Sequence, residues 1–140
     1  MSAIAPGAAA TAERRARELM RGVLDADEFR AYEELGFVSV PGRGDEASGY
    51  AYLIYPHRPL VAYETATGRL LSEYCVGFRD AGERLPDADD VLAKWMAVRG
   101  SERALIGEAN VNPPGHQIDP GHVRRDLDRL RAWRAGRMTR

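Results

Sequence analysis

The sequence has few cysteines and histidines, and it has no long apolar run. Cys75 is the only cysteine, so no disulfide can form within the chain, which fits a reducing compartment. No stretch approaches the roughly 20 apolar residues that a transmembrane helix needs, so we expect no membrane span and no membrane partner. With three histidines and no CxxC or HExxH spacing, the sequence predicts no metal site and no cofactor.

The chain also lacks a large net charge, but its charges are unevenly distributed. The formal net charge is −1, so no overall field favours a nucleic acid or a membrane surface. From Asp119 to Arg140, however, seven arginines and three aspartates give a local excess of positive charge. Lys94 is the only lysine, so arginine supplies all of the basic character of this segment.

Length and composition indicate one domain with a flexible segment at each end. The chain has 140 residues, of which 44% are hydrophobic, enough to bury a core without disulfides. Residues 1–10 are rich in Ala, Gly and Pro and lack the pattern of a signal peptide, so we expect a flexible leader. We expect residues 11–136 to form a single domain and 137–140 a flexible basic tail.

Helices are predicted at both ends of this domain. A first helix is expected from Thr11, and a second has Asp25 as N-cap, Glu28 three residues later and Gly36 as its stop. The C-terminal third predicts three more helices. The first ends at Gly100, the next spans 101–110, and the last begins with Asp119 as N-cap and Pro120 at the first helical position.

The middle of the chain predicts an antiparallel meander of three strands, with a short N-terminal segment as a fourth. These strands are expected at residues 37–40, 50–55, 60–64 and 69–77. Alternation places Tyr52 and Ile54 on one face of the second strand and Leu53 and Tyr55 on the other, and both faces are apolar. We therefore predict an α+β fold: a small antiparallel meander of 3–4 strands flanked by two N-terminal and three C-terminal helices, packed over one face of the sheet.

Three aspartates stand at the start of the third predicted helix, in "RLPDADDVLAKWM". The spacing of Asp87 and Asp89 matches the DxDx[TV] motif of haloacid-dehalogenase phosphatases, and "DADD" matches the DxDD motif of class II terpene cyclases. The first chemistry needs a buried strand before the motif, but Pro86 precedes it, and the second needs a larger enclosing chain. Helix capping explains the pattern better, with Asp87 at the N-cap and Asp90 at N3.

Other candidate residues have simpler structural interpretations. Cys75 is expected to pack in the core, although His57 could approach it as a base. A metal site formed by His116, His122 and a carboxylate is a minor alternative. The "RGD" tripeptide at 43–45 is interpreted as part of a connecting loop. Tyrosines concentrate in the meander, where core packing is favoured over an exposed interface.

The last predicted helix carries the candidate partner-binding residues. Its apolar stripe is narrow, and arginines cover most of the remaining circumference. Contact with an acidic protein surface is one interpretation, and phosphate contacts with base stacking on the tryptophan are another. Interleaved aspartates, which would pair with the arginines within the helix, favour a plain solvated face. The proposed contact residues are Arg124, Arg125, Arg129, Arg131, Trp133 and Arg134.

The central half of the sequence resembles a pattern found in small bacterial and phage-associated proteins. The resemblance is carried by "GYAYLIY", "TGRLLSEYCV", "LPDADDVLAKWM" and "IGEAN", and these motifs contain packing and turn residues. It implies that this block folds as one unit, and it implies no activity. The helical ends of the chain and the Arg-rich segment lie outside it.

From the sequence we expect a non-enzymatic interaction or accessory protein. It would have no catalytic centre, would lie in the cytoplasm or within an assembled particle, and would be part of a larger assembly, phage-derived ones included. A protein partner or a second copy of the chain would bind it. Two alternatives stand beside this expectation: a nucleic-acid-binding factor that uses the Arg-rich helix, and a small metal-dependent hydrolase that uses Asp87 and Asp89.

Overall fold

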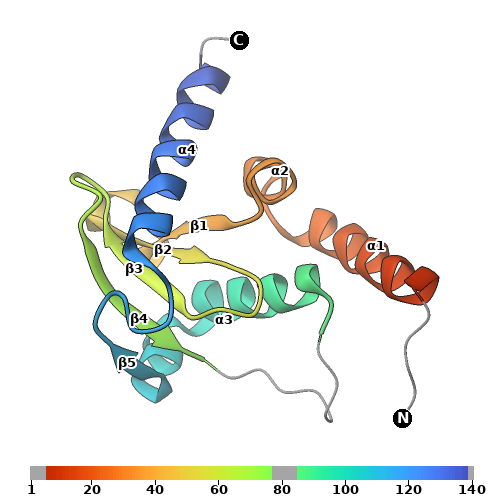
Figure 1. The fold of residues 1–140 in the computed structure, drawn as a ribbon, viewed down its shortest axis with the longest axis horizontal. Coiled ribbons are helices and arrows are strands. Elements are labelled where there is room, and N and C mark those ends of the chain that lie inside the picture. The colour runs from red at the N-terminus through yellow and green to blue at the C-terminus, as the bar shows by residue number, and fades with distance from the viewer. Residues whose placement is uncertain (1–5, 77–84, 139–140) are drawn as a thin grey trace.

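A computed structural model describes residues 6–76 and 85–138 (Figure 1). In these residues the chain forms four α-helices, five strands and two 3₁₀ turns, the turns at Gly42–Gly44 and Glu46–Ser48. The helices are α1 (Pro6–Val23), α2 (Ala26–Leu35), α3 (Asp87–Glu108) and α4 (Pro120–Met138). The strands are β1 (Val38–Pro41), β2 (Tyr50–Ile54), β3 (Leu60–Glu64), β4 (Leu70–Cys75) and β5 (Asn110–Asn112).

The strands form one antiparallel sheet in the order β1-β2-β3-β4-β5. The predicted α+β class and meander are therefore confirmed, but the sheet has five strands, not three or four. The unpredicted strand, β5, pairs with the outer side of β4 and aligns Asn110 with Cys75. It escaped prediction because it has only three residues, two of them asparagine, and shows no apolar alternation.

Helices cover both faces of the sheet. Tyr52 and Ile54 pack with residues of α1, α2 and α3 in one core cluster. Leu53 and Tyr55 pack with the apolar residues of α4 in the other. The predicted alternation of β2 is thus confirmed, whereas the expectation that all helices lie over one face was wrong. Helix α4 lies over the second face, where its apolar residues pack. Figure 1 shows its N-terminal part against the sheet.

Helix ends follow local signals in most places. Gly36 ends α2 in the left-handed conformation, with φ 91°, and Pro120 begins α4, as predicted. Helix α1 starts at Pro6, inside the segment expected to be a leader, and α4 runs past residue 137, where a tail was expected. The rest of those two terminal segments, 1–5 and 139–140, lies outside the described residues.

The helix break predicted at Gly100 is a kink and does not separate two helices. Helix α3 continues from Asp87 to Glu108, but Ser101 has φ −151° and ψ 46°, outside the helical region. Three C-terminal helices were predicted, and two are present among the described residues because the chain resumes its helix directly after this kink. No described helix is both long enough and apolar enough to cross a membrane.

Candidate functional site

Helix α4 combines a buried stripe with an exposed basic face. Val123, Leu127 and Leu130 are buried against the sheet, and Trp133 is half-buried. The C-terminal part of the helix projects away from the sheet (Figure 1). Its C-terminal half is therefore supported on one side only.

Part of the predicted contact set holds α4 against α2. The Arg129 guanidinium donates to the Leu35 carbonyl at 3.3 Å, and the Trp133 indole donates to Glu34 Oε2 at 3.2 Å. One helical turn further on, Arg137 pairs with Asp27 of α2. These contacts recur every four residues along α4, so they hold one face of α4 against α2. Arg129 and Trp133 thus stabilise the packing of α4 on α2, a role that their sequence pattern did not indicate.

The other four predicted arginines are exposed. The Arg131 guanidinium lies 3.6 Å from Asp128 Oδ1, and an exposed ion pair of this kind contributes little to stability. Arg124, Arg125 and Arg134 form no hydrogen bond or ion pair with the described part of the chain. Their charges are free to meet a partner.

Two hollows flank the projecting half of α4. The larger, which we call the α2–α4 cleft, has a volume of about 740 Å³ and lies between α2, α4 and the edge of β1. The smaller, about 330 Å³, lies between α4 and the β3–β4 turn. Leu130 and Arg134 line both hollows. The structure therefore places Trp133 at the larger hollow, Arg131 at the smaller one and Arg134 at both, and it leaves Arg124 and Arg125 outside them.

A buried carboxylate anchors the sheet-facing half of α4. Asp126 is 3% exposed and accepts from the Tyr55 hydroxyl at 2.8 Å and from Arg129 at 2.8 Å. His122 Nε2 lies 3.1 Å from the same carboxylate. Burial and the Asp126 carboxylate raise the pKa of Tyr55, so its hydroxyl stays a donor. The predicted pairing of Asp126 with an arginine is present, and the same carboxylate also attaches α4 to Tyr55, the residue directly after β2.

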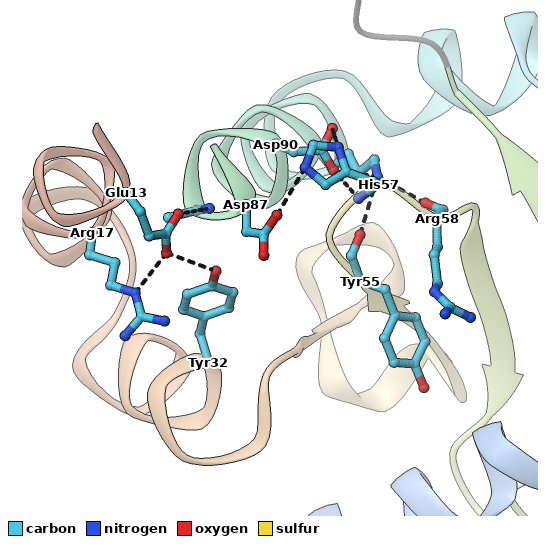
Figure 2. Close-up of polar contacts among 10 residues, drawn as sticks. Glu13, Arg17, Tyr32, Tyr55, His57, Arg58, Asp87 and Asp90 are labelled. Atoms are coloured by element: carbon cyan, nitrogen blue, oxygen red, sulfur yellow. Dashed lines mark hydrogen bonds and ion pairs between the residues drawn. The ribbon is translucent and has the colours of Figure 1, made fainter. Parts of the chain in front are cut away.

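The "DADD" aspartates do not cap α3 as predicted. The N-cap residue is Pro86, which has no side chain that can accept a hydrogen bond, and Asp87 is already helical. Asp87 is exposed, and Asp90, placed at N3 by prediction, lies one residue deeper and is 5% exposed. Instead, Glu13 of α1 accepts from the Ala88 amide at 3.0 Å (Figure 2). A carboxylate from another helix therefore satisfies one of the free amides in the first turn of α3.

Asp90 belongs to a buried ion pair with Lys94 (Figure 2). Lys94 is 2% exposed, and its ammonium lies 2.6 Å from Asp90 Oδ2. The ammonium also donates to the carbonyls of Tyr55 at 3.2 Å and Arg58 at 2.8 Å, so all three donors are used. Asp90 Oδ2 in turn accepts from the His57 amide at 2.7 Å. This pair fastens α3 to the β2–β3 turn.

His57 sits in that turn with φ 58°, in the left-handed region. Its Nε2 lies 3.0 Å from Asp87 Oδ1 without hydrogen-bond geometry, so this buried nitrogen has no hydrogen-bond partner among the described residues. His57 does not contact Cys75 in any described hydrogen bond or ion pair; the thiol accepts weakly from Gln117 Nε2 at 3.6 Å. Cys75 is half-buried, less covered than predicted.

Asp89, the second acid of the phosphatase-like motif, lies near Glu13 and not near His57 as Asp87 does. Burial and the nearby Glu13 carboxylate raise the pKa of Asp89. Asp87 faces His57 (Figure 2). Within the described residues, no group of three or more metal-ligating side chains converges, there or at His116 and His122.

The predicted tyrosine set divides between core and surface. Tyr52 and Tyr63 are buried, whereas Tyr50 and Tyr74 are half-buried and line a hollow with Glu102. Glu102 accepts from the hydroxyls of Tyr50 and Tyr52, each at 2.6 Å, and from the amide at residue 43. Burial alone would raise the pKa of Glu102, but these hydrogen bonds outweigh it and hold the pKa below its ordinary value.

Three buried or bridging groups were missed from the sequence. Lys94 and Glu102 are described above, and Glu73, 2% exposed, accepts from the amides of Gly115, Gln117 and Ile118. The sequence carried one signal for Glu73, since it is the only charged residue in a mainly apolar strand. Lys94 offered a comparable signal as the only lysine, four residues after an aspartate.

No family model, no curated protein and no solved structure matches this chain.

Proposed function

We propose that this chain is an interaction or accessory protein that binds a partner protein through the projecting half of α4. The observation that carries the proposal is the pair of hollows on either side of α4: Trp133 lines the larger, Arg131 the smaller and Arg134 both. Exposed arginine beside a half-buried tryptophan is typical of residues that dominate protein interfaces. On the sequence resemblance alone, we extend the proposal to a larger assembly, phage-derived ones included, in the cytoplasm or within a particle.

Site-specific photo-crosslinking in cells that express the protein tests this proposal. A photoreactive residue at Ala135, which lines the smaller hollow, should give one discrete adduct with a protein. The matched control is Ala104, an exposed alanine of α3 far along the chain from this region. The absence of an adduct from Ala135, or equal adducts from both positions, would contradict the proposal.

Nucleic-acid binding is the alternative that the exposed arginines favour. Arg124 and Arg125 lie outside the hollows and could add phosphate contacts along the whole helix. Fluorescence anisotropy with mixed-sequence DNA and RNA at low salt separates the two functions. Binding that weakens equally on replacing Arg124 or Arg134 would favour nucleic acid, because phosphate contacts depend on total charge.

A metal-dependent hydrolase using Asp87 and Asp89 is the third candidate. The first-turn position of both residues gives it little support, since the two carboxylates meet different neighbours. Phosphatase activity with added Mg²⁺ that is lost in Asp87→Asn would revive it.

A further inference from the structure

We infer that the hollow between α3 and the sheet binds a small molecule in which a flat aromatic ring carries an anionic group, with Arg103 as the partner of that group. We call this space the tyrosine hollow. It has a volume of about 700 Å³ and lies on the face of the sheet opposite α4. The inference is therefore independent of the function proposed for α4.

Three tyrosine rings form the floor and one side of the tyrosine hollow. Tyr50 and Tyr52 lie two residues apart on β2, so they share one face of the sheet. Tyr74 of β4 reaches them across β3, where the small Ala62 is the partner of Tyr52. The Tyr52 ring meets the other two edge to face, with centroids 5.8 Å and 6.2 Å apart. Tyr52 is 3% exposed and closes the bottom, whereas Tyr50 and Tyr74 are half-buried and line the space.

The last two turns of α3 form the opposite wall. After the kink at Ser101, this segment presents Arg103, Ile106 and Gly107 to the hollow. Their spacing of three and four residues places them on one face of the helix. Gly107 has no side chain, and a Cβ added there would meet no atom within 4 Å. The wall is therefore open at this position, and a ligand can enter beside it.

The size and lining of the tyrosine hollow suit a flat ring. Sites for small molecules measure roughly 300–1,000 Å³ and combine aromatic and aliphatic walls with a few polar groups. Tyrosine rings pack on another aromatic ring face to face with an offset, or edge to face, and both arrangements favour a planar ligand. The half-buried side chains of Tyr50, Tyr74 and Ile106 provide such apolar surface.

The carboxylate in the hollow is already satisfied by the chain itself. Glu102 Oε2 accepts from the hydroxyls of Tyr50 and Tyr52, and Oε1 accepts from the Arg43 amide, each at 2.6 Å. Burial raises the pKa of Glu102, but these hydrogen bonds and the neighbouring Arg43 charge lower it on balance. Glu102 therefore holds the two rings in place and has little capacity left for a ligand.

The free charge at the hollow is positive. Arg103 is exposed and forms no hydrogen bond or ion pair with the described part of the chain. Two arginines and one carboxylate line the space, so their formal charges sum to +1 (two minus one). An aromatic cage beside an available carboxylate would bind a cation. Here the carboxylate is occupied and Arg103 would repel a cation, so the charges favour a carboxylate or phosphate on the ligand.

A ligand titration of the full chain with labelled tyrosine, followed by NMR at low ionic strength, tests the inference. The probe is naphthoate. One control is its fully saturated analogue, which keeps the charge and loses the flat ring, and the other is naphthylmethylammonium, which keeps the ring and reverses the charge. We expect naphthoate to shift the ring signals of Tyr50 and Tyr74 with a dissociation constant in the millimolar range, and both controls to bind about tenfold more weakly.

Matched protein variants complete the test. Arg103→Gln should weaken binding of naphthoate about tenfold, whereas Arg124→Gln, an exposed arginine of α4, should not. Gly107→Leu should fill the open wall and also weaken binding about tenfold, without lowering the melting temperature, because leucine favours a helix more than glycine does.

Several results would overturn the inference. These are no binding of naphthoate, equal binding of the saturated analogue, tighter binding of the cation, signal shifts that avoid Tyr50 and Tyr74, or unchanged binding in Arg103→Gln.

Discussion

Removing Lys94 should be among the most damaging single changes in this protein. In Lys94→Met the Asp90 carboxylate, 5% exposed, keeps only the His57 amide as donor, and the carbonyls of Tyr55 and Arg58 lose a charged partner. Breaking a buried ion pair on one side costs about 3–5 kcal/mol. For a chain of this size that loss corresponds to a drop in melting temperature of roughly 10–15 °C.

Thermal and urea unfolding, followed by circular dichroism, measure this effect. The matched control is Asp89→Asn, which changes a half-exposed acid one residue before Asp90 and should alter stability by less than about 1 kcal/mol. The double variant Lys94→Met/Asp90→Leu should be more stable than Lys94→Met alone, because no buried charge remains. A loss below about 1 kcal/mol in Lys94→Met, as for an exposed pair, would refute the account of this cluster.

Three further predictions concern the sheet and the tyrosine hollow. Glu73→Ala should cost about 3 kcal/mol in urea unfolding, because three buried amides lose their acceptor, and Glu73→Gln should cost less. Gly42→Ala should displace the Tyr50 ring, which lies 2.1 Å from the added Cβ, and cost about 1–2 kcal/mol, whereas Gly100→Ala, with open space around it, should stabilise α3. Because the pKa of Glu102 is lowered in the fold, its ionised form stabilises the protein at pH values above its ordinary pKa of 4.5. This stability is lost as the pH falls through the lowered pKa. Glu102→Gln should therefore flatten the acid side of a plot of melting temperature against pH. A Glu73→Ala chain as stable as wild type, an unmoved Tyr50 ring signal, or an unchanged acid limb would each contradict its prediction.

Local signals predicted the elements of this fold well. The β-branched and aromatic runs located β2 and β3 to within a residue, Gly36 ended α2, and Pro120 began α4. Each of these signals depends on the conformational preference of the residue itself. The three-residue β5 had no such signal, because its pairing with β4 depends on a neighbour far away in the sequence.

The polar groups at the candidate sites were predicted poorly for the same reason. The Ala88 amide in the first turn of α3 donates to Glu13, 75 residues away, while Asp87 is exposed and Asp90 turns inward to Lys94. A capping rule counts local acceptors and cannot see a carboxylate supplied by another helix. In α4, likewise, the sequence identified the arginines, but only the packing against α2 separates Trp133, which is bonded to Glu34, from the exposed residues.

The most direct test of the central claim compares two charge reversals on α4 in the crosslinking experiment at Ala135. Arg134 lines both hollows, whereas Arg124 is exposed on the same helix outside them. If the projecting half of α4 binds a partner protein, Arg134→Glu abolishes the adduct and Arg124→Glu leaves it at the wild-type level. An adduct that survives Arg134→Glu, or that both reversals weaken equally, contradicts the claim.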